Sequence, residues 1–135
     1  MQEILLDSNI ILRLFDISEP SQTAKSKRLF EEAAAGKTTL VIVPPILFEV
    51  AWVLRCALKR ANGEVLDILD ALVSWPGVKV ADRERVQQAL RLGKERGVGF
   101  ADSYLAAEAA SRGLPIATFN VRHFARLGAP IRPLA

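Results

Sequence analysis

Three acidic residues and one asparagine, far apart in a sequence of 135 residues, are the side chains whose types could do chemistry together. They are Asp7, Glu49, Asp102 and Asn120, at intervals of 42, 53 and 18 residues. Carboxylates that lie close together repel one another, so they persist chiefly where a cation offsets their charge. Oxygen ligands without cysteine or histidine suit Mg²⁺ or Mn²⁺. Such an ion can turn water into hydroxide and stabilise the charge that develops during attack on a phosphate.

The order of strands and helices must bring these residues together. Apolar runs bounded by turn residues predict strands at residues 4–7, 40–43, 78–80 and 114–119, with a last extended piece near Ile131. Helices are expected at residues 21–36, 46–59, 62–73, 82–93 and 101–112, followed by a helical turn around His123. This alternation predicts a three-layer α/β/α fold, in which helices cover both faces of a central parallel sheet of four to five short strands.

Sites in open parallel sheets lie outside the carboxyl ends of the strands. Asp7 ends the first expected strand and Asn120 ends the late one, while Asp102 opens the helix that leads into that late strand. Glu49 follows the second strand and is expected in the first turn of the next helix. The topology therefore predicts that all four side chains face one crevice.

Each of these residues also has an ordinary structural interpretation when it is taken alone. Asp7 suits an Asx turn, and Asp102 suits the positive end of a helix dipole. Asn120 is a common residue type at the end of a strand. Glu49 differs, because it stands among apolar neighbours where an unpaired charge is costly to bury. Their convergence on one edge, rather than any single residue, favours a metal site.

Length and composition indicate one domain over residues 1–135, with 50% hydrophobic and 24% charged residues. The single cysteine and the single histidine, Cys56 and His123, exclude an internal disulfide and a structural zinc site. We expect Cys56 to fill space in a buried helix and His123 to lie at a turn without an acidic partner. The apolar stretch at 40–54 is too short to cross a membrane, and the N-terminus lacks the pattern of a signal peptide, so we expect a cytoplasmic protein without membrane contact.

Several segments together resemble the PIN domain. They are LLDSNIIL with Asp7, the helix with Glu49 after Pro-Pro, and GFADSYLAAEAASRGLPIATFN with Asp102 and Asn120. More narrowly, residues 2–135 resemble the compact toxins of the VapC type. The resemblance implies an endoribonuclease that uses Mg²⁺ or Mn²⁺ to cut single-stranded RNA or an RNA loop and leaves 5′-phosphate and 3′-hydroxyl ends. It also implies the toxin of a type II toxin–antitoxin pair, forming a homodimer held inactive by a cognate antitoxin protein.

Carried over by position, the resemblance makes Asp7, Glu49 and Asp102 the catalytic acids that hold the metal and its water. Asn120 stands where the family often has a fourth acid, and this departure leaves open whether one metal binds or two. Thr118 matches a hydroxyl residue that could orient a ligand or touch phosphate.

Further residues are expected around the acids. Ser8 and Asn9 resemble the polar pair that follows the first acid, where they would support it by hydrogen bonds. The net charge is +3, so the surface outside three screened acids would carry +3 plus 3, or +6, and attract phosphate. Arg122, two residues after Asn120, is the arginine expected nearest the site, whereas Arg13 and Arg126 near other strand ends fit solvated surface positions. Tyr104 is expected in the core or at a dimer surface.

Other functions fit the sequence less well. A phosphotransfer domain with Asp7 as nucleophile would need a second acid beside it and a lysine late in the chain, but Ser8 and Asn9 follow Asp7, and no lysine follows Lys94. No phosphate-binding glycine motif follows a strand. A non-catalytic RNA-binding or scaffold protein on a degenerate PIN fold remains the alternative, because one acid is missing. The helix at 46–59, apolar nearly all round, predicts a surface for a second copy or an antitoxin.

Overall fold

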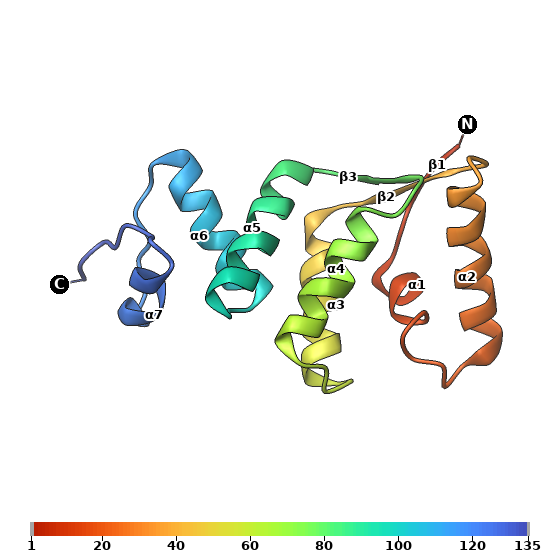
Figure 1. Ribbon diagram of the computed structural model, residues 1–135, viewed down its shortest axis with the longest axis horizontal. Helices are drawn as coiled ribbons and strands as arrows, with labels where there is room; N and C mark the ends of the chain where they lie inside the picture. The colour runs from red at the N-terminus through yellow and green to blue at the C-terminus, as the bar shows by residue number, and fades with distance from the viewer. Residues whose placement is uncertain (1, 135) are drawn as a thin grey trace. The chain divides into compact units, whose positions relative to one another are not determined.

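The computed structural model describes residues 2–134 and has mixed α/β secondary structure (Figure 1). The chain divides into two compact parts, the first ending at Arg83 and the second beginning at Glu84. The described residues contain three β-strands and seven α-helices. Among these helices, none combines the length and hydropathy that a membrane span requires. The expectation of a single domain over the whole chain stays a prediction.

The first part contains one parallel sheet with the strand order β1-β2-β3. Leu40 in the central strand lies opposite Ile4 on one side and Val78 on the other. The predicted α/β class with a parallel sheet is thereby confirmed. The strands are β1 (Glu3–Leu5), β2 (Thr39–Ile42) and β3 (Val78–Val80), and the helices of this part are α1 (Ser8–Leu12), α2 (Pro20–Ala34), α3 (Pro44–Cys56) and α4 (Asn62–Val73).

Buried aliphatic side chains hold the first part together. Leu40 and Ile42 alternate with half-buried residues along β2 and are themselves fully buried. Helix α3 buries Leu47, Val50 and Leu54, which recur at the spacing of one helix face. That helix packs against α1 and α4, and α4 in turn contacts β3. Each such side chain contributes about 1.5–3 kcal/mol relative to exposure, so this face of α3 is a major source of stability.

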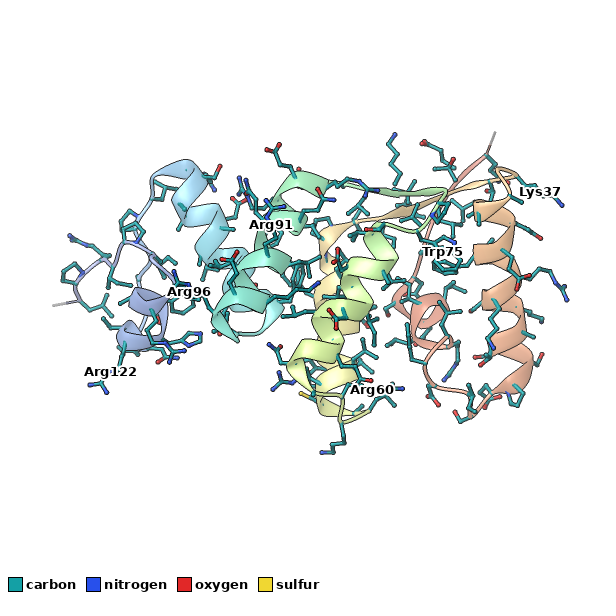
Figure 2. The ribbon with its side chains drawn as sticks, in the orientation of Figure 1. Lys37, Arg60, Trp75, Arg91, Arg96 and Arg122 are labelled. Atoms are coloured by element: carbon teal, nitrogen blue, oxygen red, sulfur yellow. The ribbon has the colours of Figure 1, made fainter. Side chains whose placement is uncertain are left out.

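Gly77 determines how closely β3 can approach its neighbours. Its φ is +84°, and a Cβ atom at this position would lie 2.3 Å from the carbonyl oxygen of Ala33. The Gly77 carbonyl accepts a hydrogen bond of 2.8 Å from the N–H of Leu40 in β2. Two residues earlier, the indole N–H of Trp75 donates to the carbonyl of Phe30 in α2, at 2.9 Å (Figure 2). A side chain at position 77 would therefore disturb the entry to the third strand.

The second part consists of helices and loops around a small apolar core. The guanidinium of Arg85 pairs with the carboxylate of Glu108, which links two of these helices. Gly113, with φ +64°, ends the helix that carries Glu108, as a left-handed C-cap. The helices are α5 (Arg83–Arg96), which begins at the boundary, α6 (Phe100–Arg112) and α7 (Val121–Arg126). The core side chains are Val98, Ala106, Ala109, Ile116, Phe124, Leu127 and Ala129.

The expectation of four to five strands is wrong for the described residues, because the strand predicted at 114–119 does not form. Only Ile116 pairs, in a single parallel bridge to Ile131. The N–H of Leu114 donates to the carbonyl of Ala109 in α6 at 3.0 Å, Pro115 has no N–H to donate, and Leu114 is exposed, so the first residues of this run neither pair with a strand nor gain burial. The segment anchors the loop by one buried residue instead of extending the sheet.

Two expectations about the first part also need correction. The residues after Asp7, expected to form a polar turn, form the short helix α1. Cys56, expected to be a buried filler, is exposed at the end of α3. The buried face of α3 contains Leu54, and Cys56 lies two residues further on, about 200° around the helix axis. The apolar character of that helix therefore does not bury every side of it.

Candidate functional site

Asp7 lies two residues after the end of β1 and is the N-cap residue of α1. Its backbone is extended, with φ −80° and ψ 154°, and its Oδ1 atom accepts a hydrogen bond of 2.8 Å from the N–H of Ser8. The N–H of Leu6 still donates to the carbonyl of Val41 in β2, at 3.1 Å, so the chain is tied to the sheet up to the preceding residue. Asp7 is exposed. The fold thus presents this carboxylate to solvent at the carboxyl end of the sheet.

Glu49 lies in the second turn of α3 and not in the first, because that helix begins at Pro44. It is exposed, whereas Leu47 and Val50 on either side are fully buried. The expectation that apolar neighbours in sequence would surround Glu49 is wrong, because they point to a different face of the helix. Since α1 packs against α3, Asp7 and Glu49 belong to two contacting elements of the first part.

Asp102 lies in the first turn of α6 and carries a hydrogen bond that the sequence did not reveal. Its Oδ2 atom is 2.9 Å from Nε2 of His123 on α7. The side chain of Asp102 is 48% exposed and that of His123 is 22% exposed. The His123 ring also makes an edge contact with Phe124, with ring centroids 5.1 Å apart. The prediction that His123 has no acidic partner is therefore wrong, and the histidine holds this carboxylate in one orientation.

Asn120 and Thr118 form a tight turn before α7. Asn120 is the N-cap residue of α7, is exposed, and makes no capping hydrogen bond with its side chain. Its N–H donates to Oγ1 of Thr118 at 2.9 Å. The hydroxyl of Thr118 therefore shapes this turn, and its expected role toward a ligand stays a prediction.

The remaining predicted residues lie in different surroundings. Ser8 is buried, and its backbone N–H, described above, supports Asp7. Asn9 is exposed and lines a cavity of about 300 Å³ between α1 and α2. Arg13 lines the same cavity, but its guanidinium bonds Asp16 at 3.0 Å and Gln22 at 2.7 Å. Arg13 is thus half-buried and committed to neighbours within the protein, and it is not the solvated arginine that the sequence led us to expect.

The remaining residues discussed from the sequence are two arginines and a tyrosine of the second part. Arg122 is exposed on α7 and extends outward from that helix (Figure 2). Arg126, one turn later, is also exposed. Tyr104 is half-buried and makes an edge contact with Phe100, with centroids 5.8 Å apart. Tyr104 therefore packs against a residue of its own helix, and its expected place in the core or at a dimer surface stays a prediction.

The donor atoms fit a hard divalent cation, but a metal cluster is not observed. Within residues 2–134, no group of three or more histidine, cysteine, aspartate or glutamate side chains is arranged to hold a metal ion. Asp7 and Glu49 belong to the first part, and Asp102 and Asn120 to the second. Three accessible carboxylates and an amide oxygen are the ligand types that Mg²⁺ and Mn²⁺ prefer. The convergence of all four residues stays a prediction.

Comparison with known proteins places these residues in a wider context. The sequence matches the PIN domain over residues 4–130. No curated protein matches it. Among solved structures, the chain is similar to the crystal structure of VapBC2 from Rickettsia felis bound to a DNA fragment from their promoter. The identity is 17%, the similarity covers 97% of this chain and 96% of that chain, and the TM-score is 0.38.

Proposed function

Because the chain belongs to the PIN domain family, whose members are generally nucleases, we propose that it is a Mg²⁺- or Mn²⁺-dependent endoribonuclease. The observation that carries the proposal is an accessible carboxylate at the carboxyl end of a parallel strand, Asp7, held by the N–H of Ser8. The family match extends from residue 4 to residue 130, so it includes all three acids and Asn120 in their order along the chain.

In this proposal Asp7, Glu49 and Asp102 are the catalytic residues that hold the ion, and the amide oxygen of Asn120 is a fourth ligand. A bound Mg²⁺ or Mn²⁺ would supply an activated water and offset the negative charge of the phosphate. The chain's own contribution is positioning, since the N–H of Ser8 orients the first acid and His123 orients the third. Hydrolysis joins the water oxygen to phosphorus, and the 3′ oxygen leaves with a proton.

The protein is further proposed to act in the cytoplasm as a VapC-type toxin, as a homodimer restrained by an antitoxin protein. The sequence resemblance supports this part of the proposal. Trp52 on α3, which is 65% exposed, would lie in such an interface. In addition, an apolar cavity of about 320 Å³ lies in the first part, where Phe30, Leu72 and Trp75 are among its lining residues.

The test is cleavage of RNA by the purified protein with Mg²⁺ or Mn²⁺ and in EDTA. We expect cleavage that requires the metal and is lost in Asp7→Asn and in Asp102→Asn. The matched control is Asp82→Asn, since Asp82 is exposed and its φ of +54° is tolerated by asparagine. Cleavage that persists in both site variants would reject the site. RNA binding without cleavage under every metal condition would favour the alternative of a non-catalytic RNA-binding protein.

A further inference from the structure

Phe119 is an aromatic side chain that the fold leaves in solvent. It is 97% exposed, compared with 70% for Leu5 and Ile17, the next most exposed large hydrophobic side chains of the described residues. A single exposed apolar side chain is ordinary. The position of Phe119 is unusual, because the residue lies directly between Thr118 and Asn120, in the turn that precedes α7.

This turn is anchored on both sides, so the ring is presented by a defined backbone. Before it, Ile116 is buried and pairs with Ile131. After it, Phe124 is buried, and its N–H donates to the carbonyl of Asn120 at 3.3 Å. The backbone of Phe119 therefore has a defined position, from which the ring offers a flat apolar face to solvent.

The stretch of sequence that contains Phe119 carries only positive charge. Residues 109–135 contain four arginines and no aspartate or glutamate. Two of them, Arg122 and Arg126, are exposed on α7, within seven residues of Phe119. An exposed aromatic ring followed by exposed arginines is a combination with which proteins bind single-stranded nucleic acid, through base stacking and phosphate contacts.

We infer that Phe119 stacks on a base of single-stranded RNA while Arg122 and Arg126 contact the neighbouring phosphates. The inference rests on the proposed function and adds to it a positioning residue next to Asn120. Trp52, the other strongly exposed aromatic residue, has a mixed setting, because Glu49 precedes it by one helical turn and Arg55 follows it by one. The charge pattern therefore favours RNA binding at Phe119 and not at Trp52.

Binding is measured in the Asp7→Asn background, where cleavage does not consume the probe. The probe is a fluorescein-labelled 12-nucleotide oligoadenylate, followed by fluorescence anisotropy. We expect Phe119→Ala and Phe119→Leu to raise Kd by about fivefold or more, the effect of losing one stacked base. Phe119→Trp should keep the parent affinity, because indole also stacks. The control Leu134→Ala removes another exposed apolar side chain from the same acid-free segment and should change nothing.

Two further measurements separate stacking from other effects. With an oligonucleotide of equal length that lacks its bases, Phe119→Ala should bind as well as the parent, because no base is there to stack. Arg122→Gln and Arg126→Gln should each reduce the slope of log Kd against log salt by about 0.7. Thermal melts of all variants should match the parent, since none of these side chains is buried.

Equal Kd values for the parent, Phe119→Ala and Phe119→Leu would overturn the inference that Phe119 stacks on a base. The proposed nuclease function would still stand in that case if the parent cleaves RNA. Weaker self-association or antitoxin binding in Phe119→Ala, with RNA affinity unchanged, would overturn the inference as well and assign the ring to a protein interface. A parent chain that neither cleaves nor binds RNA would reject both.

Discussion

His123 on α7 holds the carboxylate of Asp102 on α6, with Nε2 and Oδ2 2.9 Å apart. The two residues are 21 positions apart, and both helices contribute to the small core of the second part, through Ala106 and Phe124 among others. With a proton on Nε2, the ring donates to the acid and fixes the direction of its other oxygen. The contact gives a half-exposed carboxylate a defined orientation.

Removal of this contact is expected to weaken metal binding more than folding. His123→Ala should lower Mn²⁺ affinity by about 10- to 100-fold, the range observed for partners that orient metal ligands. His123→Gln, which can still donate a hydrogen bond, should recover part of the loss. Isothermal titration with Mn²⁺ measures the affinity, and thermal melts in EDTA measure the fold. Unchanged affinity together with a lower melting temperature would show that His123 only supports the core.

The two roles of Asp7 can be separated by two substitutions. Asp7→Asn keeps an oxygen that accepts from the N–H of Ser8 but loses the charge, so it should fold normally and lose metal-dependent cleavage. Asp7→Ala loses both and should also lower the free energy of unfolding by about 1 kcal/mol. Urea denaturation of the three proteins in EDTA checks this. Equal stability of Asp7→Ala and the parent would show that the capping bond contributes nothing.

Asn120→Asp adds a fourth carboxylate at a position that the family often gives to an acid. If Asn120 faces the other acids, the variant should melt lower than the parent in EDTA and gain more from saturating Mg²⁺, because a ligand that binds only the folded state stabilises it. Asn120→Ala serves as the control, and its melting temperature should rise less with Mg²⁺ than that of the parent. If Asn120→Asp melts no lower than the parent in EDTA, and if its melting temperature rises no more with Mg²⁺, Asn120 does not belong to the site.

Gly77→Ala is expected to destabilise the first part by at least about 2 kcal/mol. The added Cβ would meet the carbonyl of Ala33 at 2.3 Å, and the φ of +84° is strained for alanine. The control is Gly63→Ala in α4, where nothing lies within 4 Å of the added atom, and it should be neutral or slightly stabilising. Urea midpoints of the two variants test the difference. Equal midpoints would contradict the close approach of β3 to α2.

The proposed homodimer predicts a particle of twice 14.8 kDa at micromolar concentration. Trp52→Ser should shift it toward the monomer if the exposed face of α3 lies in the interface. Sedimentation velocity distinguishes the two masses, and Ile17→Ser, which changes a similarly exposed residue outside that helix, is the control. A monomer in the parent chain would reject self-association.

Elements whose boundaries are marked by local chemistry could be predicted from the sequence. The helix at Asn62–Val73 and the strand at Val78–Val80 were expected at these residues, because Asn-Gly opens one and Trp-Pro-Gly separates the two. The strand at 114–119 was not predicted correctly, since pairing depends on a partner that local sequence does not specify.

The candidate site was predictable in its residue types and only partly in its surroundings. Asp7 follows a strand and Asp102 lies in the first turn of a helix, as sequence patterns indicate, whereas Glu49 lies one turn further into its helix than expected. The exposure of Glu49 depends on the helix face that packs, and the pairing of His123 with Asp102 depends on a contact between two helices. The spacing of 21 residues carries no signal of that contact, so only the folded chain reveals it.

The sole cysteine of the chain is exposed at the end of α3, two helical turns beyond Glu49. A maleimide dye or a nitroxide will therefore attach at Cys56 alone, without prior removal of competing thiols. Spectroscopists thus have a single reporter, already built into the native sequence, on the helix that carries one of the three acids. Changes in its emission or line shape as Mn²⁺, RNA or a partner protein is added will register events at that helix in real time.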